Sequence, residues 1–172
     1  MTATLAITVL GLDRPGIIAE VTGQLAELGG NLQDSSMTLL RGHFAWTLLV
    51  AVDAGPADVQ ARLARLTDEG LVVSVLVLPE QSPGGVDGTE WLLSVHGGDR
   101  PGIVSGLTAP IAEAGGNITD LTTRLGAGLY ILVAEVSLPG DVDVTALTSR
   151  IAEVSAQLGV RATLHPAETD VL

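Results

Sequence analysis

Residues 13–17 read Asp-Arg-Pro-Gly-Ile, and the same five residues recur 86 positions later, at 99–103. At this offset, and without gaps, residues 13–34 are identical to residues 99–120 at 12 of 22 positions. The shared block includes a Gly-Gly-Asn triplet, at 29–31 and again at 115–117. Self-similarity at one fixed offset is the signature of a repeated structural unit. The sequence therefore predicts two copies of one small domain.

The two copies have the same order of predicted elements. Alternating β-forming residues predict strands in the first copy at 4–10, 31–41, 43–53 and 71–78, and helical spacing predicts helices at 17–28 and 57–69. The corresponding strands of the second copy are 90–96, 117–125, 129–138 and 159–165, and its helices are 102–114 and 143–157. Each copy is thus βαββαβ, an α+β ferredoxin-like domain in which two helices cover one face of a four-stranded antiparallel sheet.

A segment rich in Pro, Gly, Ser and acidic residues separates the copies, at 79–88. This composition is typical of a linker, which we place at 80–89, between domains at 1–79 and 90–172. The copies differ just before the repeated turn, where Leu12 corresponds to Gly98, so the two turns need not work alike. Pro110 lies inside the first helix of the second copy and predicts a kink or one missing backbone hydrogen bond.

Composition and charge narrow the range of functions. The chain has eight Arg, no Lys and 20 acidic residues, for a net charge of −12. Such a surface disfavours direct binding to nucleic acid or to anionic membranes. The absence of Cys excludes disulfides and thiolate chemistry. The N-terminus has no signal-peptide pattern and no apolar run approaches the roughly 18 residues of a membrane span, so we expect a cytoplasmic protein.

The repeated turn has the chemistry of a carboxylate site. In the first copy we expect Pro15 at the first helical position and Gly16 beside it, with no Cβ over the helix N-terminus. The unpaired amides and the dipole at such an N-terminus attract a carboxylate, and Arg14 could add a bidentate contact. A purely structural role is equally open, because Asp13 could cap the helix in an ordinary strand-to-helix turn.

The Gly-Gly-Asn triplets are expected to end the first helix of each copy in a left-handed turn. Asn31 and Asn117 would then begin the next strand, and a structural role is sufficient to explain them. If that strand begins close to the repeated turn, the Asn side chain could also contact the amino or carboxylate group of a ligand.

Other reactive residues form no recognisable catalytic arrangement. His43, His96 and His165 lack the spacing of metal ligands, no carboxylate pair recurs in both copies, and Ser35-Ser36 has no partner base. Phosphate-binding loops and nucleophile motifs are also missing. The sequence predicts no enzyme, no metal site and no cofactor.

The Asp-Arg-Pro-Gly-Ile turn followed by Gly-Gly-Asn-Leu or Gly-Gly-Asn-Ile resembles the ACT domain. Two such domains in one short chain are similar to the family of the glycine cleavage system transcriptional repressor. The resemblance implies that a small effector, an amino acid such as glycine or serine, binds in the turn region at an interface between domains. It also implies side-by-side pairing of the four-stranded sheets, a homodimer and action through a partner protein. The ligand-binding residues carried over by position are Asp13, Arg14, Pro15, Gly16, Ile17, Asn31, Leu32, Asp99, Arg100, Pro101, Gly102, Ile103, Asn117 and Ile118.

A second hypothesis is a ligand-free dimerisation scaffold. The sheets of this fold have edge strands that must be covered or paired. The apolar segment from Phe44 to Val52 could supply the interface.

Overall fold

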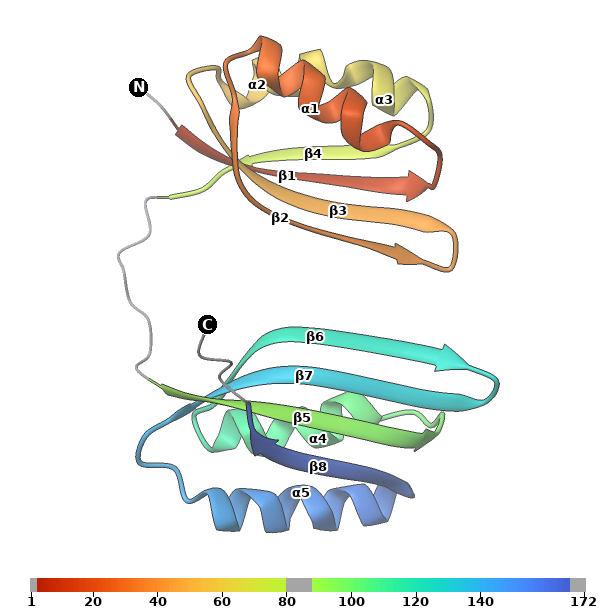
Figure 1. The fold of residues 1–172 in the computed structure, drawn as a ribbon, viewed down its shortest axis with the longest axis vertical. Helices are drawn as coiled ribbons and strands as arrows, with labels where there is room; N and C mark the ends of the chain where they lie inside the picture. Colours follow the sequence, from red (N-terminus) through yellow and green to blue (C-terminus); the bar gives the residue numbers. More distant parts are fainter. Residues whose placement is uncertain (1–2, 80–87, 168–172) are drawn as a thin grey trace. The chain divides into compact units, whose positions relative to one another are not determined.

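The computed structural model describes residues 3–79 and 88–167. The chain divides into two compact units, Met1–Pro83 and Gly84–Leu172, called domain 1 and domain 2 below (Figure 1). Most of the predicted linker, at 80–87, lies outside the described residues. The units are described separately, and the side-by-side pairing of their sheets stays a prediction.

Domain 1 has the predicted βαββαβ order, with its second helix in two pieces. Its elements are β1 (Ala3–Leu12), α1 (Ile17–Glu27), β2 (Asn31–Leu40), β3 (His43–Val52), α2 (Pro56–Arg62), α3 (Ala64–Asp68) and β4 (Val72–Val77). The strands form an antiparallel sheet in the order β2-β3-β1-β4. The helix predicted at 57–69 is interrupted where the amide of Leu66 donates to the carbonyl of Leu63, only three residues back.

Domain 2 repeats this architecture. Its elements are β5 (Gly88–Gly98), α4 (Ile103–Glu113), β6 (Asn117–Gly126), β7 (Leu129–Pro139), α5 (Val144–Leu158) and β8 (Val160–Pro166). The antiparallel sheet has the equivalent order β6-β7-β5-β8. The two ferredoxin-like domains are therefore confirmed, although β5 begins two residues before the predicted strand and includes Gly88 and Thr89 of the predicted linker.

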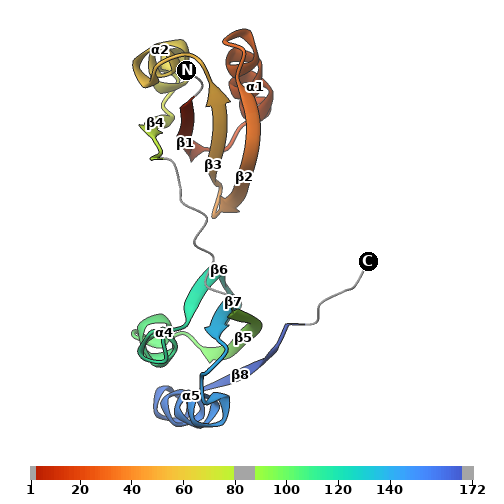
Figure 2. The ribbon, with the colours of Figure 1, turned by 90° about the vertical axis from the view of Figure 1, so that its left-hand side faces the viewer.

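Each domain buries one face of its sheet under its helices (Figures 1 and 2). In β1 the alternate residues Leu5, Ile7 and Val9 are fully buried. The buried residues of α1 are Ile17, Val21 and Leu25, spaced by four so that they lie on one side of the helix. A fully buried aliphatic side chain contributes about 1.5–3 kcal/mol, so these rows hold each helix against its sheet. The other face of each sheet is covered by no described helix.

The segment from Phe44 to Val52, which the scaffold hypothesis suggested as an interface, has no free edge. It forms β3, an interior strand between β2 and β1. Its large side chains alternate into the core, where Phe44 and Trp46 pack edge to face with ring centroids 6.1 Å apart. The edge strands of this sheet are β2 and β4, and the residues of β2 are exposed except for the half-buried Thr38. The core-facing residues of this segment are therefore unavailable to a partner, and an interface on its other face stays a prediction.

Pro110 does not interrupt its helix. α4 runs as one element from Ile103 to Glu113, and Pro110 is buried with Leu107 and Ile111. The consequence that remains is the missing amide hydrogen of Pro110, which would otherwise donate to the carbonyl of Gly106.

None of the helices in the described parts of the chain has the length and apolar character needed to cross a membrane.

Candidate functional site

The two repeated turns have nearly identical backbones. Gly16 and Gly102 occupy the position just before α1 and α4, with φ of 90° and 89°. Both lie in the left-handed region that residues with a Cβ rarely adopt, which explains why Gly is used there. Pro15 and Pro101 therefore precede the helix, and the expectation that Pro15 is the first helical residue is wrong. The reason is that a left-handed residue stands between the proline and the first helical turn.

The N-termini of α1 and α4 have no side-chain cap. The capping role considered for Asp13 is not observed; its backbone amide instead donates to the carbonyl of Gly42, which ties the turn to the β2–β3 hairpin. In α5, by contrast, Asp143 accepts a hydrogen bond from the amide of Ala146. An uncapped helix start leaves several amide hydrogens without an intrahelical acceptor. Open space surrounds the Cα of both turn glycines, so an anion could approach these donors.

The arginine of the first turn belongs to an ion cluster that the sequence reasoning missed. Arg14 donates from Nη2 to Oε2 of Glu20 at 3.0 Å, and it also pairs with Glu69. Arg65 completes the cluster, with Nε 2.9 Å from Oε1 of Glu69 and 3.6 Å from Oε1 of Glu20. The guanidinium of Arg14 is thus already satisfied by two carboxylates. Only the helical spacing of Arg65 and Glu69 could have signalled part of this cluster in the sequence.

The cluster shifts the acid–base equilibria of its members. The hydrogen bond from Arg65, assisted by the charge of Arg14, lowers the pKa of the Glu69 carboxyl below its ordinary value of 4.5. The hydrogen bond to Glu20 raises the pKa of Arg14. Both shifts favour the charged forms of Arg14 and Glu69.

Domain 2 lacks this cluster. Glu20 corresponds to Gly106 at the 86-residue offset, and the strand registers align Arg65 and Glu69 with Val154 and Leu158. An ideal Cβ on Gly106 would lie 3.1 Å from Cδ1 of Leu158 and 3.4 Å from Cγ1 of Val154. An apolar contact between α4 and α5 therefore stands where domain 1 has its ion pairs.

The arginine of the second turn is consequently unpaired. Among the residues described, Arg100 has no hydrogen-bond or ion-pair partner. Its guanidinium lies over Gly159, whose ideal Cβ would be 3.2 Å from Nη1 of Arg100. The two turns therefore share a backbone but differ in the availability of the arginine.

The Gly-Gly pairs end α1 and α4 as predicted. Gly29 and Gly115 are left-handed, with φ of 72° and 76°. The amide of Gly30 donates to the carbonyl of Leu25 at 2.9 Å, the long-range bond of a Schellman cap. A Cβ on Gly30 would lie 2.9 Å from that carbonyl oxygen, so the second glycine is required by close approach.

Asn31 does not lie near the turn of its own domain, contrary to expectation. It pairs with Ala51, which in turn pairs with Thr4 at the start of β1, whereas the turn follows the end of β1. Asn117 is placed in the same way at the start of β6. The eleven-residue helix between turn and Asn is about 16 Å long and separates the two groups. Of the other predicted residues, Ile17 and Ile103 are buried in the cores, so only their backbones could meet a ligand.

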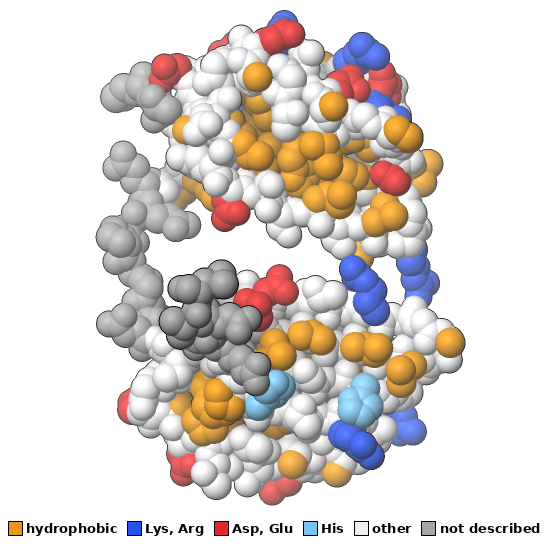
Figure 3. All heavy atoms as spheres, in the orientation of Figure 1, with side chains coloured by type: hydrophobic (Ala, Val, Ile, Leu, Met, Phe, Trp, Pro, Cys, Tyr) orange, Lys and Arg blue, Asp and Glu red, His pale blue; other side chains and the backbone are white. Residues whose placement is uncertain are grey.

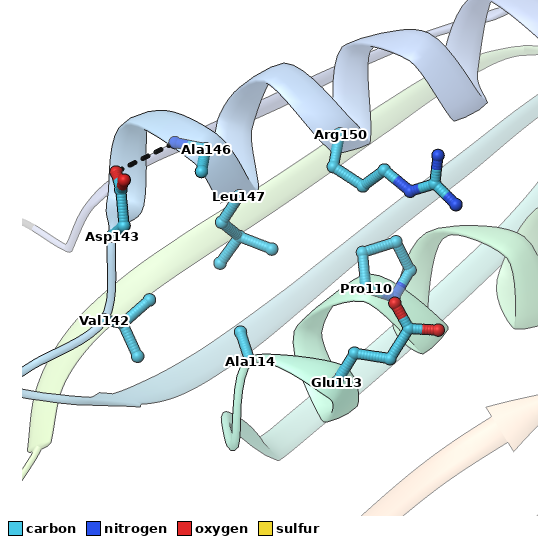
Figure 4. A pocket seen from close by; sticks show the side chains of 8 residues that line it. All are labelled: Pro110, Glu113, Ala114, Val142, Asp143, Ala146, Leu147 and Arg150. Carbon is cyan, nitrogen blue, oxygen red and sulfur yellow. Dashed lines mark hydrogen bonds between the residues drawn. The ribbon is translucent and has the colours of Figure 1, made fainter.

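Two hollows on domain 2 border α4. One, of about 380 Å³, follows α4 from Ser105, in its first turn, to Asn117 and Ile118. This groove therefore connects Asn117 with the first turn of α4. The other, of about 330 Å³, lies between the end of α4 and the start of α5 (Figure 4). Its lining combines apolar side chains such as Leu147 with the charged residues Glu113 and Arg150, and with Asp143, which caps α5. Within the described residues, no group of His, Asp and Glu is arranged to hold a metal ion.

Comparison with known proteins identifies the architecture. A family model of the ACT domain matches residues 3–70 and again residues 90–165. A UPF0237 protein of Methanopyrus kandleri is 42% identical over 78 residues, which are 43% of this chain and 84% of that protein. The structure of a protein of unknown function from Galdieria sulphuraria superposes with a TM-score of 0.79 at 29% identity, over 97% of this chain and 99% of that one. A candidate glycine cleavage system transcriptional repressor shares the fold at 19% identity, with a TM-score of 0.66 over 96% of this chain and 97% of its own. The chain belongs to the ACT domain family, as two ACT domains in tandem.

Proposed function

We propose that this protein is a regulator that binds a small amino acid, such as glycine or serine, and acts through a partner protein. The observation that carries the proposal is the pair of uncapped helix starts, each behind a left-handed glycine with open space around it. Backbone amides at such a position suit a carboxylate. A small ligand also suits a turn that offers few side chains of its own.

We place the stronger carboxylate site in domain 2. Arg100 is unpaired and is free to form a charge-assisted contact with the ligand, whereas Arg14 would first have to leave Glu20 and Glu69. The groove along α4, from Ser105 to Asn117, lies beside the same helix start and has room for the rest of a small ligand. Domain 1 retains its turn amides, but its turn arginine, Arg14, is held by two carboxylates.

Isothermal titration calorimetry against the twenty amino acids tests the proposal. We expect heat and a thermal shift with at least one small amino acid, and a loss of affinity of about tenfold or more in Arg100→Ala, since a charge-assisted hydrogen bond contributes about 1.5–3 kcal/mol. Arg14→Ala is the matched control and should retain wild-type affinity. No response to any amino acid, or equal losses in the two variants, would contradict the proposal.

A ligand-free dimer scaffold is the second candidate. It is favoured by β2, an exposed edge strand that displays Met37, Leu39 and Leu40, each about half exposed. Light scattering separates the candidates: a homodimer whose mass and melting temperature ignore every amino acid supports the scaffold.

A further inference from the structure

In each sheet, one row of four cross-strand neighbours lies on the face that no described helix covers. The side chains in this row differ between the two domains. In domain 2 the strand registers align Arg124, Ile131, His96 and Arg161 across β6, β7, β5 and β8. At the same offsets, domain 1 aligns Thr38, Ala45, Leu10 and Val72. Alternation along the strands directs both rows away from the helices, because the neighbouring residues Val95 and Val9 are buried in the cores. One domain thus has a basic row where the other has an uncharged one.

The basic row borders a hollow. His96, Gly159, Val160 and Arg161 line an open depression of about 510 Å³. The guanidinium of Arg100 lies over Gly159 and adds a third basic group at its rim. In Figure 3, histidine and arginine side chains lie next to one another on domain 2, while hydrophobic side chains gather on domain 1. Leu10 and Val72, which occupy the equivalent positions of domain 1, are exposed hydrophobic residues.

No described carboxylate neutralises His96 or Arg161. Neither has an ion pair within the described residues. On the helix-free face of this sheet the nearest acidic pair along the strands is Asp120 beside Glu135, four residues along β7 from Ile131. Four residues span about 13 Å of strand, which exceeds the Debye length of about 8 Å at physiological salt. Within the described residues, the guanidinium groups of Arg100 and Arg161 therefore stand without an ion-pair partner in a chain of net charge −12.

We propose that this basic depression of domain 2, formed by His96, Arg100 and Arg161, binds a small oxyanion with two negative charges, such as a phosphate group or a dicarboxylate. Guanidinium groups bind such oxyanions through parallel N–H donors, and the imidazole adds a further donor. A zwitterionic amino acid suits the depression poorly, because its ammonium group would stand among three basic side chains. The oxyanion site shares Arg100 with the proposed amino-acid site, but it takes a ligand of different charge, and His96 and Arg161 belong to it alone.

Titration calorimetry with inorganic phosphate and with succinate, at ionic strength matched with sodium chloride, tests the proposal. We expect binding of at least one of the two, and the better one identifies the source of the anion. The double variant His96→Leu, Arg161→Val gives domain 2 the residues that domain 1 carries, and it should weaken binding at least tenfold. Arg150→Ala, on the exposed face of α5, is the control and should bind as the wild type does.

A second variant, which places the basic residues in domain 1, keeps the test valid even if the domain 2 variant does not fold. Leu10→His with Val72→Arg should give domain 1 a partial copy of the row and add a second, weaker binding event. Absence of binding by the wild type beyond the chloride control would overturn the proposal, as would wild-type affinity in the His96→Leu, Arg161→Val protein. Amino-acid binding should persist in that variant, so failure here and failure of the proposed function are distinguishable.

Discussion

Domain 1 and domain 2 have the same backbone at the repeated turn and different chemistry around it. The φ angles of Gly16 and Gly102 agree within 1°. In domain 1 the turn arginine pairs with the carboxylates of Glu20 and Glu69, whereas in domain 2 its guanidinium lies over Gly159. The comparison teaches that two ACT turns can keep the same backbone conformation while the charged partners of their arginine differ. Four predictions test how far the likeness and the difference extend.

The largest expected effect is on stability, and it tests a feature that the two domains share: the second glycine of each Gly-Gly pair. Gly30→Ala would force a Cβ to 2.9 Å from the carbonyl oxygen of Leu25, and Gly116→Ala would force one to 2.7–2.8 Å from Leu138 and Ile111. We expect each change to lower the free energy of unfolding by about 2–3 kcal/mol, as overpacking does. Denaturant unfolding measures it. Gly23→Ala, in open space on α1, is the control and should stabilise by about 0.5–1 kcal/mol.

The next effect tests whether the two turns are energetically alike. Gly16→Ala and Gly102→Ala meet no neighbouring atom but place a Cβ at φ near 90°. We expect each to cost about 1–2 kcal/mol, equally in the two domains, because the strain depends on the backbone alone. Thermal unfolding monitored by calorimetry reports both domains. A large inequality between the two variants would show that the turns differ in more than their side chains.

The difference between the domains predicts a salt-independent contact in domain 2. Leu158→Ala removes a half-buried side chain that packs toward Gly106. We expect a loss of about 1–2 kcal/mol, less than for a fully buried leucine. The loss should be the same at low and high salt, because the contact is apolar. If the loss of unfolding free energy depended strongly on salt, the description of the contact between α4 and α5 as apolar would be wrong.

The smallest effect is the acid sensitivity of domain 1. The pKa of Glu69 is lowered in the folded protein, so its contribution is present above the ordinary value of 4.5 and is lost as the pH falls through the lowered value. Glu69→Gln should therefore reduce the melting temperature slightly near neutral pH and not at all in strong acid. Melting curves of both proteins from neutral pH downward measure this. A difference that persists in strong acid would show that Glu69 acts other than through its charge.

The sequence was sufficient for the fold because the duplication shows each element twice. The order of strands and helices and the left-handed ends of α1 and α4 followed from periodicity and from the Gly-Gly pairs. The position of Asn31 did not, because it depends on the direction in which α1 returns along the sheet. The pairing of Arg14 with Glu69 joins residues 55 positions apart, and no local pattern signals such a contact.

The most direct test of the carboxylate site is a backbone amide NMR titration with the amino acid that gives the largest heat. The amides of Gly102, Ile103 and Val104, at the uncapped start of α4, should shift on ligand addition, and their counterparts at the start of α1 should shift less or only at higher concentration. Shifts elsewhere on the protein, with the amides at the start of α4 unmoved, would contradict the assignment of the site to this turn.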